Sequence, residues 1–219
     1  MERIPVETAG FVVEDLIEVV NANRAYLSEI DGAIGDGDHG INMAKGFSAA
    51  GARLAGDAPA GLARALAVLG ETLLEDVGGS MGPLYGTFFG AMSEALGGKE
   101  FLDAATFAAM LGAGQAGIVE IGGARVGDKT LLDALVPARD AFDAALAAGQ
   151  PFGECLRLMA AAAELGKEAT RGLVAKVGRA SRLGERSRGA LDAGATSCAL
   201  LLQSMARTIG SSLESGRAP

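Results

Sequence analysis

The chain has 219 residues, enough for one large domain or two small ones, and no linker-like stretch divides it. Its formal net charge of −8 argues against general binding to nucleic acids or anionic membranes, because both require a basic surface. Apolar residues make up 49% of the chain and aromatic residues only 5%, which favours a core of closely packed aliphatic helices. We therefore predict a single domain over residues 1–219, with no nucleic acid and no membrane as partners.

Apolar residues recur at helical spacing through most of the chain, and no segment keeps the alternation of a strand. This spacing predicts helices near residues 7–27, 41–55, 60–76, 84–97, 102–119, 129–148, 152–172 and 194–213. Most connections are short, which favours antiparallel neighbours in an up-and-down bundle. Three connections are longer and rich in glycine and polar residues, at 28–40, 78–83 and 173–193. Binding residues tend to lie on loops held by a rigid scaffold, so we expect the functional residues there.

The first long connection carries Asp31, Asp36, Asp38 and the only histidine of the chain, His39. Three carboxylates this close repel one another unless a cation lies between them, and Mg2+ prefers oxygen ligands of this kind. One interpretation is therefore a site for a metal ion and a phosphate. The other is a solvent-exposed acidic turn, because aspartate and glycine are common in turns.

A calcium loop of the EF-hand type is excluded at this position, because Gly40, Ile41 and Phe47 stand where that loop needs an oxygen ligand, a glycine and a glutamate. His39 has two interpretations of equal weight. It either enters the second helix as a residue bonded to the backbone, or it contacts a phosphate or a base. The free amides at the start of that helix favour an anion.

The last long connection is the one concentrated basic region of an acidic chain. It is either a solvated loop or a surface that binds a polyphosphate or an acidic partner, since guanidinium groups hold phosphate oxygens through two parallel hydrogen bonds. Its basic residues are Arg171, Lys176, Arg179, Arg182, Arg186 and Arg188.

The pattern G-x-G-x-x-G of dinucleotide-binding folds occurs at Gly112, Gly114 and Gly117, but the residues before it look helical, whereas the fold requires a strand there. We interpret these glycines as positions where two helices approach closely. Cys155 and Cys198 lie in apolar helical patterns and indicate buried thiols rather than a disulfide or a zinc site. The sequence shows neither a signal peptide at its start nor an apolar run of roughly 18 residues, so we expect a cytoplasmic protein.

Five motifs, in order along essentially the whole chain, closely resemble the nucleotide-binding L subunit of dihydroxyacetone kinase, DhaL. They lie at residues 31–47, 77–89, 127–130, 178–186 and 192–197. The resemblance implies a closed all-α barrel of eight antiparallel amphipathic helices, which binds ADP or ATP at one end through two Mg2+ ions.

By match to the family motifs, Asp31, Asp36 and Asp38 would hold the metal ions. The residues that would line the nucleotide are His39, Gly40, Ile41, Asn42, Ser80, Met81, Gly122, Leu131, Arg179, Asp192, Ala193 and Gly194. Two positions depart from the family. Some relatives carry Ala-Ser in place of Ser80-Met81, which puts the hydroxyl contact in doubt, and the usual proline is replaced by Ala193, which leaves that turn less stiff.

The implied activity is transfer of a phosphoryl group to dihydroxyacetone, or to a related short ketose, held on a histidine of a separate K subunit. Because His39 is assigned to the nucleotide site, this chain alone is not the complete kinase. An alternative is a phosphocarrier with permanently bound ADP, which a protein of the phosphoenolpyruvate-dependent phosphotransferase system would rephosphorylate. The resemblance also leaves open a transcription regulator as a partner, and a homodimer.

Overall fold

The computed structural model describes residues 2–56 and 60–215, and almost all of them lie in helices or short turns. In chain order the elements are β1 (Ile4–Pro5), η1 (Val6–Thr8), α1 (Phe11–Ala22), α2 (Arg24–Ile34), α3 (His39–Leu54), α4 (Leu62–Asp76), α5 (Met81–Ala95), β2 (Phe101–Leu102), α6 (Ala104–Gly122), α7 (Leu132–Ala147), α8 (Phe152–Ala169), η2 (Thr170–Gly172), η3 (Arg179–Ser187) and α9 (Ala193–Ser215). The three η elements are short 3₁₀ helices.

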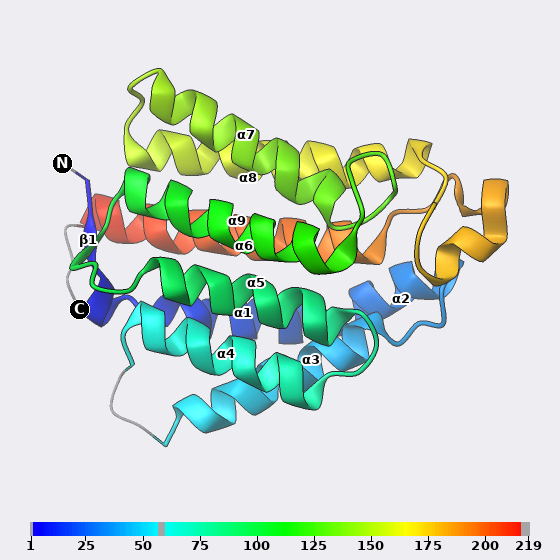
Figure 1. The fold of residues 1–219 in the computed structure, drawn as a ribbon, viewed down its shortest axis with the longest axis horizontal. Coiled ribbons are helices and arrows are strands. Elements are labelled where there is room, and N and C mark those ends of the chain that lie inside the picture. The colour runs from blue at the N-terminus through cyan, green and yellow to red at the C-terminus, as the bar shows by residue number, and fades with distance from the viewer. Residues whose placement is uncertain (1, 57–59, 216–219) are drawn as a thin grey trace.

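Eight of the helices form a closed ring, in which each packs on two neighbours. The order around the ring is α1, α3, α4, α5, α6, α7, α8 and α9, and α9 returns to pack on α1. Figure 1 shows the ring helices running back and forth along the long axis of the molecule. The predicted all-α barrel of eight antiparallel helices is therefore confirmed, and α2 is an additional short helix at one end.

The ring encloses one continuous hydrophobic core. Phe47, Phe89, Phe107 and Phe142 are completely buried in it, together with leucine, valine and methionine side chains from every ring helix. The two predicted buried thiols, Cys155 and Cys198, are also in this core. This burial of aliphatic and aromatic surface is the main force that closes the ring.

The prediction of one helix over residues 7–27 is wrong. The chain forms η1 and α1, breaks at Asn23, and begins again as α2. Asn23 has dihedral angles of φ −100° and ψ 10°, and its side-chain amide donates to the carbonyl of Val19 at 2.8 Å. A short amide side chain that bonds to nearby backbone competes with the helical hydrogen bonds, which explains the break.

The prediction of a long loop over residues 28–40 is also wrong, because α2 continues to Ile34 and only residues 35–38 lie outside helices. Polar and glycine residues hid this helix in the sequence, since Leu27 and Ile34 are its only buried residues. The loop at 173–193 contains η3, and the strands β1 and β2, which pair in antiparallel fashion, were not predicted. The other helix boundaries agree with the predictions to within about three residues.

Small residues allow α5 and α6 to pack closely, as the sequence indicated. A Cβ atom on Gly114 would lie 2.6 Å from the ring of Phe88, and one on Gly117 would lie 2.8 Å from Thr87. Helix α6 is long and apolar enough to cross a membrane by length and composition. It is nevertheless a ring helix between α5 and α7, with Phe107 and Leu111 fully buried in the core.

Candidate functional site

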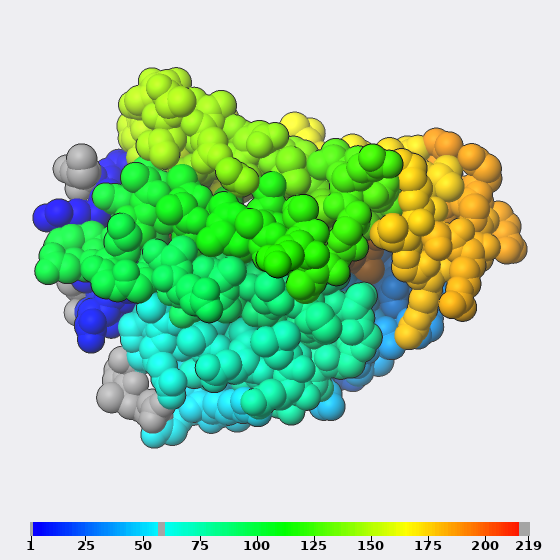
Figure 2. All heavy atoms as spheres, viewed as in Figure 1, coloured from blue at the N-terminus to red at the C-terminus, as the bar shows by residue number. Residues whose placement is uncertain are grey.

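A cavity of about 750 Å³ opens at one end of the ring. It lies among the segment before α3, the turn before α5, the end of α6, and the segments that precede α7 and α9. In Figure 2 the surface is hollowed between the green end of α6 and the gold segment that leads into η3. The cavity brings together all of the site residues predicted from the sequence except two, Gly40 and Ile41.

Gly40 and Ile41 have other surroundings. A Cβ atom on Gly40 would lie 2.0 Å from the carbonyl oxygen of Arg24, so a glycine is needed for α3 to begin against α2. The side chain of Ile41 is 47% exposed and does not line the cavity. The neighbouring Asn42, one residue further along α3, does line it.

Three carboxylates form a cluster at the edge of the cavity. Asp31 lies on the last turn of α2, whereas Asp36 and Asp38 lie on the short segment that follows, and oxygens of all three come within 4.8 Å of one another. Asp38 precedes α3 but its carboxylate makes no capping hydrogen bond, so it stays available to a ligand. The absence of a side chain at Gly35 keeps the cluster open, because a Cβ atom there would lie 2.4 Å from an oxygen of Asp31. Such a group of carboxylate oxygens fits a hard divalent cation such as Mg2+.

One arginine reaches this cluster from the other side of the cavity. Arg179, the first residue of η3, contacts the carboxylate of Asp36 and lies 3.8 Å from that of Asp38. Its side chain is 60% exposed, so it is free to turn toward a bound anion. Three other basic residues of this part of the chain, Arg171, Lys176 and Arg188, pair with nearby carboxylates.

His39 lines the cavity, and its ring belongs to a buried hydrogen-bond network. Its ring Nε2 lies 2.9 Å from the hydroxyl of Ser197 on α9, and that hydroxyl lies 2.7 Å from the hydroxyl of Tyr85 on α5. The backbone N–H of His39 donates to Asp31 at 3.3 Å. Burial lowers the pKa of His39 to about 4, although the charge of Asp31 acts in the opposite direction. The imidazole is therefore neutral at physiological pH.

Lys129 is a buried cation among the residues that line the cavity, and the sequence analysis gave it no role. Its side chain is 2% exposed, and its ammonium group donates to four backbone carbonyls at 2.7 to 3.3 Å. These carbonyls belong to Thr170, Leu173, Ser187 and Ala190, so one side chain holds both ends of the segment that contains η3. Burial lowers the pKa of Lys129, and the charge of Asp192 opposes that effect.

Asp192 stands at the entrance to α9. Its carboxylate accepts a hydrogen bond from the N–H of Ala195 at 2.7 Å, and its own N–H donates to the hydroxyl of Thr170. Burial raises the pKa of Asp192 to about 7, against the effect of the Ala195 hydrogen bond. These contacts fix the turn at Ala193 and Gly194.

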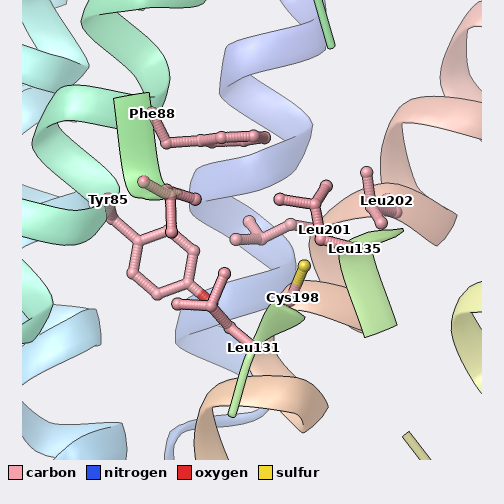
Figure 3. A pocket seen from close by; sticks show the side chains of 8 residues that line it. Tyr85, Phe88, Leu131, Leu135, Cys198, Leu201 and Leu202 are labelled. Carbon is pink, nitrogen blue, oxygen red and sulfur yellow. The ribbon is translucent and has the colours of Figure 1, made fainter. Parts of the chain in front are cut away.

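The floor of the cavity is apolar. Figure 3 shows the side chains of Tyr85, Phe88, Leu131, Leu135, Cys198, Leu201 and Leu202 converging there. These side chains leave no room for a water molecule. Tyr85 and Leu131 line both this floor and the cavity above it, so the polar site rests directly on the core of the ring.

Comparison with known proteins gives a consistent result. The chain matches the DAK2 domain over residues 33–207. It is 41% identical to the ADP-binding subunit DhaL of PEP-dependent dihydroxyacetone kinase 1 from Listeria innocua, over 90% of this chain and 93% of that protein. It is 35% identical to the ADP-binding subunit DhaL of the PEP-dependent dihydroxyacetone kinase from Escherichia coli, over 86% and 90% of the two chains.

A solved structure is similar as well. The dihydroxyacetone kinase of C. freundii, in complex with AMP-PNP and Mg2+, matches with a TM-score of 0.67 and 27% sequence identity. The match covers 90% of this chain and 33% of that longer chain.

Proposed function

Because the chain belongs to the DAK2 domain family, we propose that it is the nucleotide-binding L subunit of a dihydroxyacetone kinase. Its relatives of similar length are ADP-binding subunits of such kinases. The observation in the structure that carries the proposal is the cluster of Asp31, Asp36 and Asp38 at the edge of a nucleotide-sized cavity. A cavity of about 750 Å³ falls within the size range of small-molecule and cofactor sites.

Each part of the site has a role in phosphoryl transfer. Two Mg2+ ions held by the three aspartates would neutralise the phosphate charge and align the donor with the acceptor. Arg179 is placed to turn from Asp36 toward the phosphates, where its guanidinium group would bind their oxygens. His39 and Asn42, in the first turn of α3, line the cavity beside the aspartate cluster.

The rest of the cavity would bind the nucleoside. Residues of three separate elements line it, so nucleotide binding would hold these elements together. They are Ser80 and Met81 before and at the start of α5, Gly122 and Leu131 around the loop that follows α6, and Asp192, Ala193 and Gly194 at the start of α9.

The acceptor substrate belongs to a partner. The only histidine of the chain, His39, is bonded to Ser197 inside the nucleotide site and is not available to hold a ketone covalently. We therefore assign dihydroxyacetone, or a related short ketose, to a separate K subunit that closes the cavity from outside. Erythrulose kinases among the relatives support a short ketose as the substrate class.

A second mode is favoured by the names of the relatives, which describe PEP-dependent and PTS-dependent kinases. In that mode ADP stays bound and receives its phosphate from a phosphotransferase-system protein. A transcription regulator as a partner, a homodimer and a cytoplasmic location stay predictions.

A reconstitution assay tests the proposal. The purified chain is mixed with dihydroxyacetone and a K subunit, once with Mg-ATP and once with ADP, phosphoenolpyruvate and the phosphotransferase proteins. We expect dihydroxyacetone phosphate only when both subunits are present, and the arm that supports turnover identifies the phosphate donor. Native mass spectrometry of the chain should show added mass of ADP and Mg2+. Full activity without the K subunit, or no nucleotide binding at all, would refute the proposal.

A further inference from the structure

The chain between α8 and α9 forms a closed loop that carries Arg179. The two sides of the loop are joined near its base, because the N–H of Ala175 donates to the hydroxyl of Ser187 at 2.9 Å. That hydroxyl in turn donates to the carbonyl of Gly184 at 2.6 Å. We call residues 177–186, which lie beyond this junction, the arm. Figure 1 shows the arm, in gold and orange, past the end of the ring and beside α2.

Lys129 enters the base of this loop from the segment before α7. Its ammonium group donates to the carbonyls of Thr170 and Leu173 on one side of the loop, and to those of Ser187 and Ala190 on the other. An ammonium group has three protons, so these four acceptors use all of them. The lysine therefore joins both sides of the loop below the arm.

The backbone of Lys129 has an uncommon conformation. Its φ of 64° is the only positive φ of a non-glycine residue in the part of the chain that the structure describes. Such a conformation persists where surrounding contacts fix it, and it occurs preferentially at functional sites. Here the carboxylate of Asp133 accepts hydrogen bonds from the N–H groups of Gly127 at 2.6 Å and Thr130 at 2.7 Å, one on each side of Lys129. The lysine is thus tied to α7, a ring helix.

The contacts of Arg179 itself are too weak to keep the arm at the cavity. Arg179 contacts the carboxylates of Asp36 and Asp38, but these ion pairs are exposed, and exposed ion pairs stabilise a structure little. A metal ion and phosphates bound at the cluster would also take these carboxylates away from the arginine. The contacts at the base of the loop do not involve the cluster, so they stay in place when a ligand binds.

We propose that Lys129 and Ser187 are positioning residues, which hold the arm so that Arg179 stays beside the cavity when it leaves Asp36 for a nucleotide phosphate. This inference rests on the proposed function for the identity of the ligand. Lys129 does not bind the phosphate itself, because the carbonyls use its protons. An arginine on a fixed arm loses less conformational freedom on binding than one on a loose loop, so the base of the loop contributes to affinity through Arg179.

A double-mutant cycle between Lys129→Met and Arg179→Gln tests the proposal. In the wild-type background we expect Arg179→Gln to weaken the binding of Mg-ADP about tenfold, the effect of one hydrogen bond to a charged group. In the Lys129→Met background the arginine is no longer held, so the same change should weaken binding less than about twofold. Titration calorimetry measures the four affinities at a temperature where circular dichroism shows every variant to be folded.

Two results of this cycle would overturn the proposal. One is an equal effect of Arg179→Gln in the two backgrounds, which would mean that Lys129 stabilises the chain without positioning the arginine. The other is an Arg179→Gln chain that binds Mg-ADP as tightly as the wild type, because there would then be no contribution of Arg179 to position.

Leu66→Ala controls for a loss of stability alone. Leu66 is a buried core residue of α4 that does not line the cavity, so its truncation destabilises the ring without touching the arm. In this background Arg179→Gln should keep its full effect of about tenfold. If its effect falls here as well, the coupling comes from lower stability, and the positioning role is refuted.

Ser187→Ala tests the arm from its other side, and it decides the question if Lys129→Met does not fold. The change removes the hydroxyl that joins Ala175 to Gly184 but leaves the carbonyl that accepts from Lys129. We expect Arg179→Gln to weaken Mg-ADP binding less than about threefold in this background. A full tenfold effect would contradict the proposal.

Trypsin cleavage without nucleotide separates a failure of this inference from a failure of the proposed function. The arm carries three exposed arginines, Arg179, Arg182 and Arg186. Lys129→Met should be cut in the arm about ten times faster than Leu66→Ala, because only the lysine variant frees the arm locally. Equal rates would refute the inference. A wild-type chain that binds no ADP would instead refute the proposed function, whereas the cleavage rates would still show whether Lys129 holds the arm.

Discussion

Lys129 and the pair Asp36 and Asp38 border the same cavity, but the lysine is buried and the two aspartates are exposed. Lys129 is 2% exposed, and its ammonium group donates to four backbone carbonyls. The carboxylates of Asp36 and Asp38 are nearly half exposed, and among the described residues Arg179 is the cation that contacts them. The protein satisfies the lysine completely from its own backbone and leaves the aspartates to be satisfied by a ligand.

This difference in burial indicates that Lys129 stabilises the fold, whereas the aspartates are placed to bind a ligand. A buried ammonium group without partners is strongly unfavourable, so the carbonyls around Lys129 are needed whenever the chain is folded. Exposed carboxylates keep their hydration and are screened by solvent, so their mutual repulsion costs little stability when no metal ion is bound. We therefore expect substitutions at Lys129 to affect folding, and substitutions in the aspartate cluster to affect binding.

Replacement of Lys129 by methionine should have the largest effect. The change keeps the length of the side chain but leaves four carbonyls without their donor, and we expect a loss of about 3 kcal/mol in the free energy of unfolding. Urea denaturation measures this loss. Lys176→Met is the control, since Lys176 is exposed and forms one ion pair with Asp128, so its loss should stay below about 1 kcal/mol. Equal stability of the two variants would contradict the structural role of Lys129.

Replacement of Asp36 by asparagine should have the next largest effect, and on binding alone. The change removes a negative charge from the metal cluster with almost no change in size. We expect Mg-dependent ADP binding to weaken about 100-fold, or about 2.7 kcal/mol. Titration calorimetry measures the affinity, and the urea midpoint should not fall.

Asp140→Asn is the matched control for this change, because Asp140 is an exposed aspartate on α7 that does not line the cavity. Its ADP affinity should equal that of the wild-type chain. Retention of full affinity in Asp36→Asn would remove Asp36 from the metal site.

Replacement of Arg179 by glutamine should have the smallest effect, a modest increase in the affinity for Mg2+. Without nucleotide, Arg179 partly neutralises Asp36 and Asp38, so its removal should raise the affinity for Mg2+ alone. Exposed ion pairs contribute about 0.2 to 1 kcal/mol, which corresponds to a gain of about 1.4- to fivefold. Calorimetric titration with MgCl2 in low salt measures the gain, with Arg182→Gln on the same segment as the control. A lower Mg2+ affinity in Arg179→Gln would show that the arginine does not compete with the metal ion.

Local patterns in the sequence predicted most of the fold. Apolar residues at helical spacing located the ring helices, because each ring helix buries one continuous face. The same signal failed for α2, which buries only Leu27 and Ile34 and carries the polar residues of the metal cluster. A helix that serves a site at its own end has fewer positions left to form an apolar face.

The candidate site was predictable where its residues are adjacent in the chain, as the three aspartates are. Contacts between residues far apart in the chain could not be predicted from local sequence patterns. Ser197 lies 158 positions from His39, and the carbonyls around Lys129 lie 41 to 61 positions beyond it. A buried lysine is rare, and nothing in the residues beside Lys129 predicts that backbone oxygens from another segment surround it. These contacts exist only after the ring has closed.

The length of α9 also determines how this unit can be joined to others. Asp192 to Gly194 line the cavity where α9 begins, and its 23 residues extend about 34 Å toward the other end of the ring, where it packs on β1. Figure 1 shows β1 and the far end of α9 together, away from η3. A polypeptide linker joined at β1 or at the far end of α9 would therefore leave the cavity uncovered. The barrel can thus serve as a separate subunit or as a module of a longer polypeptide without any change in its nucleotide-binding end.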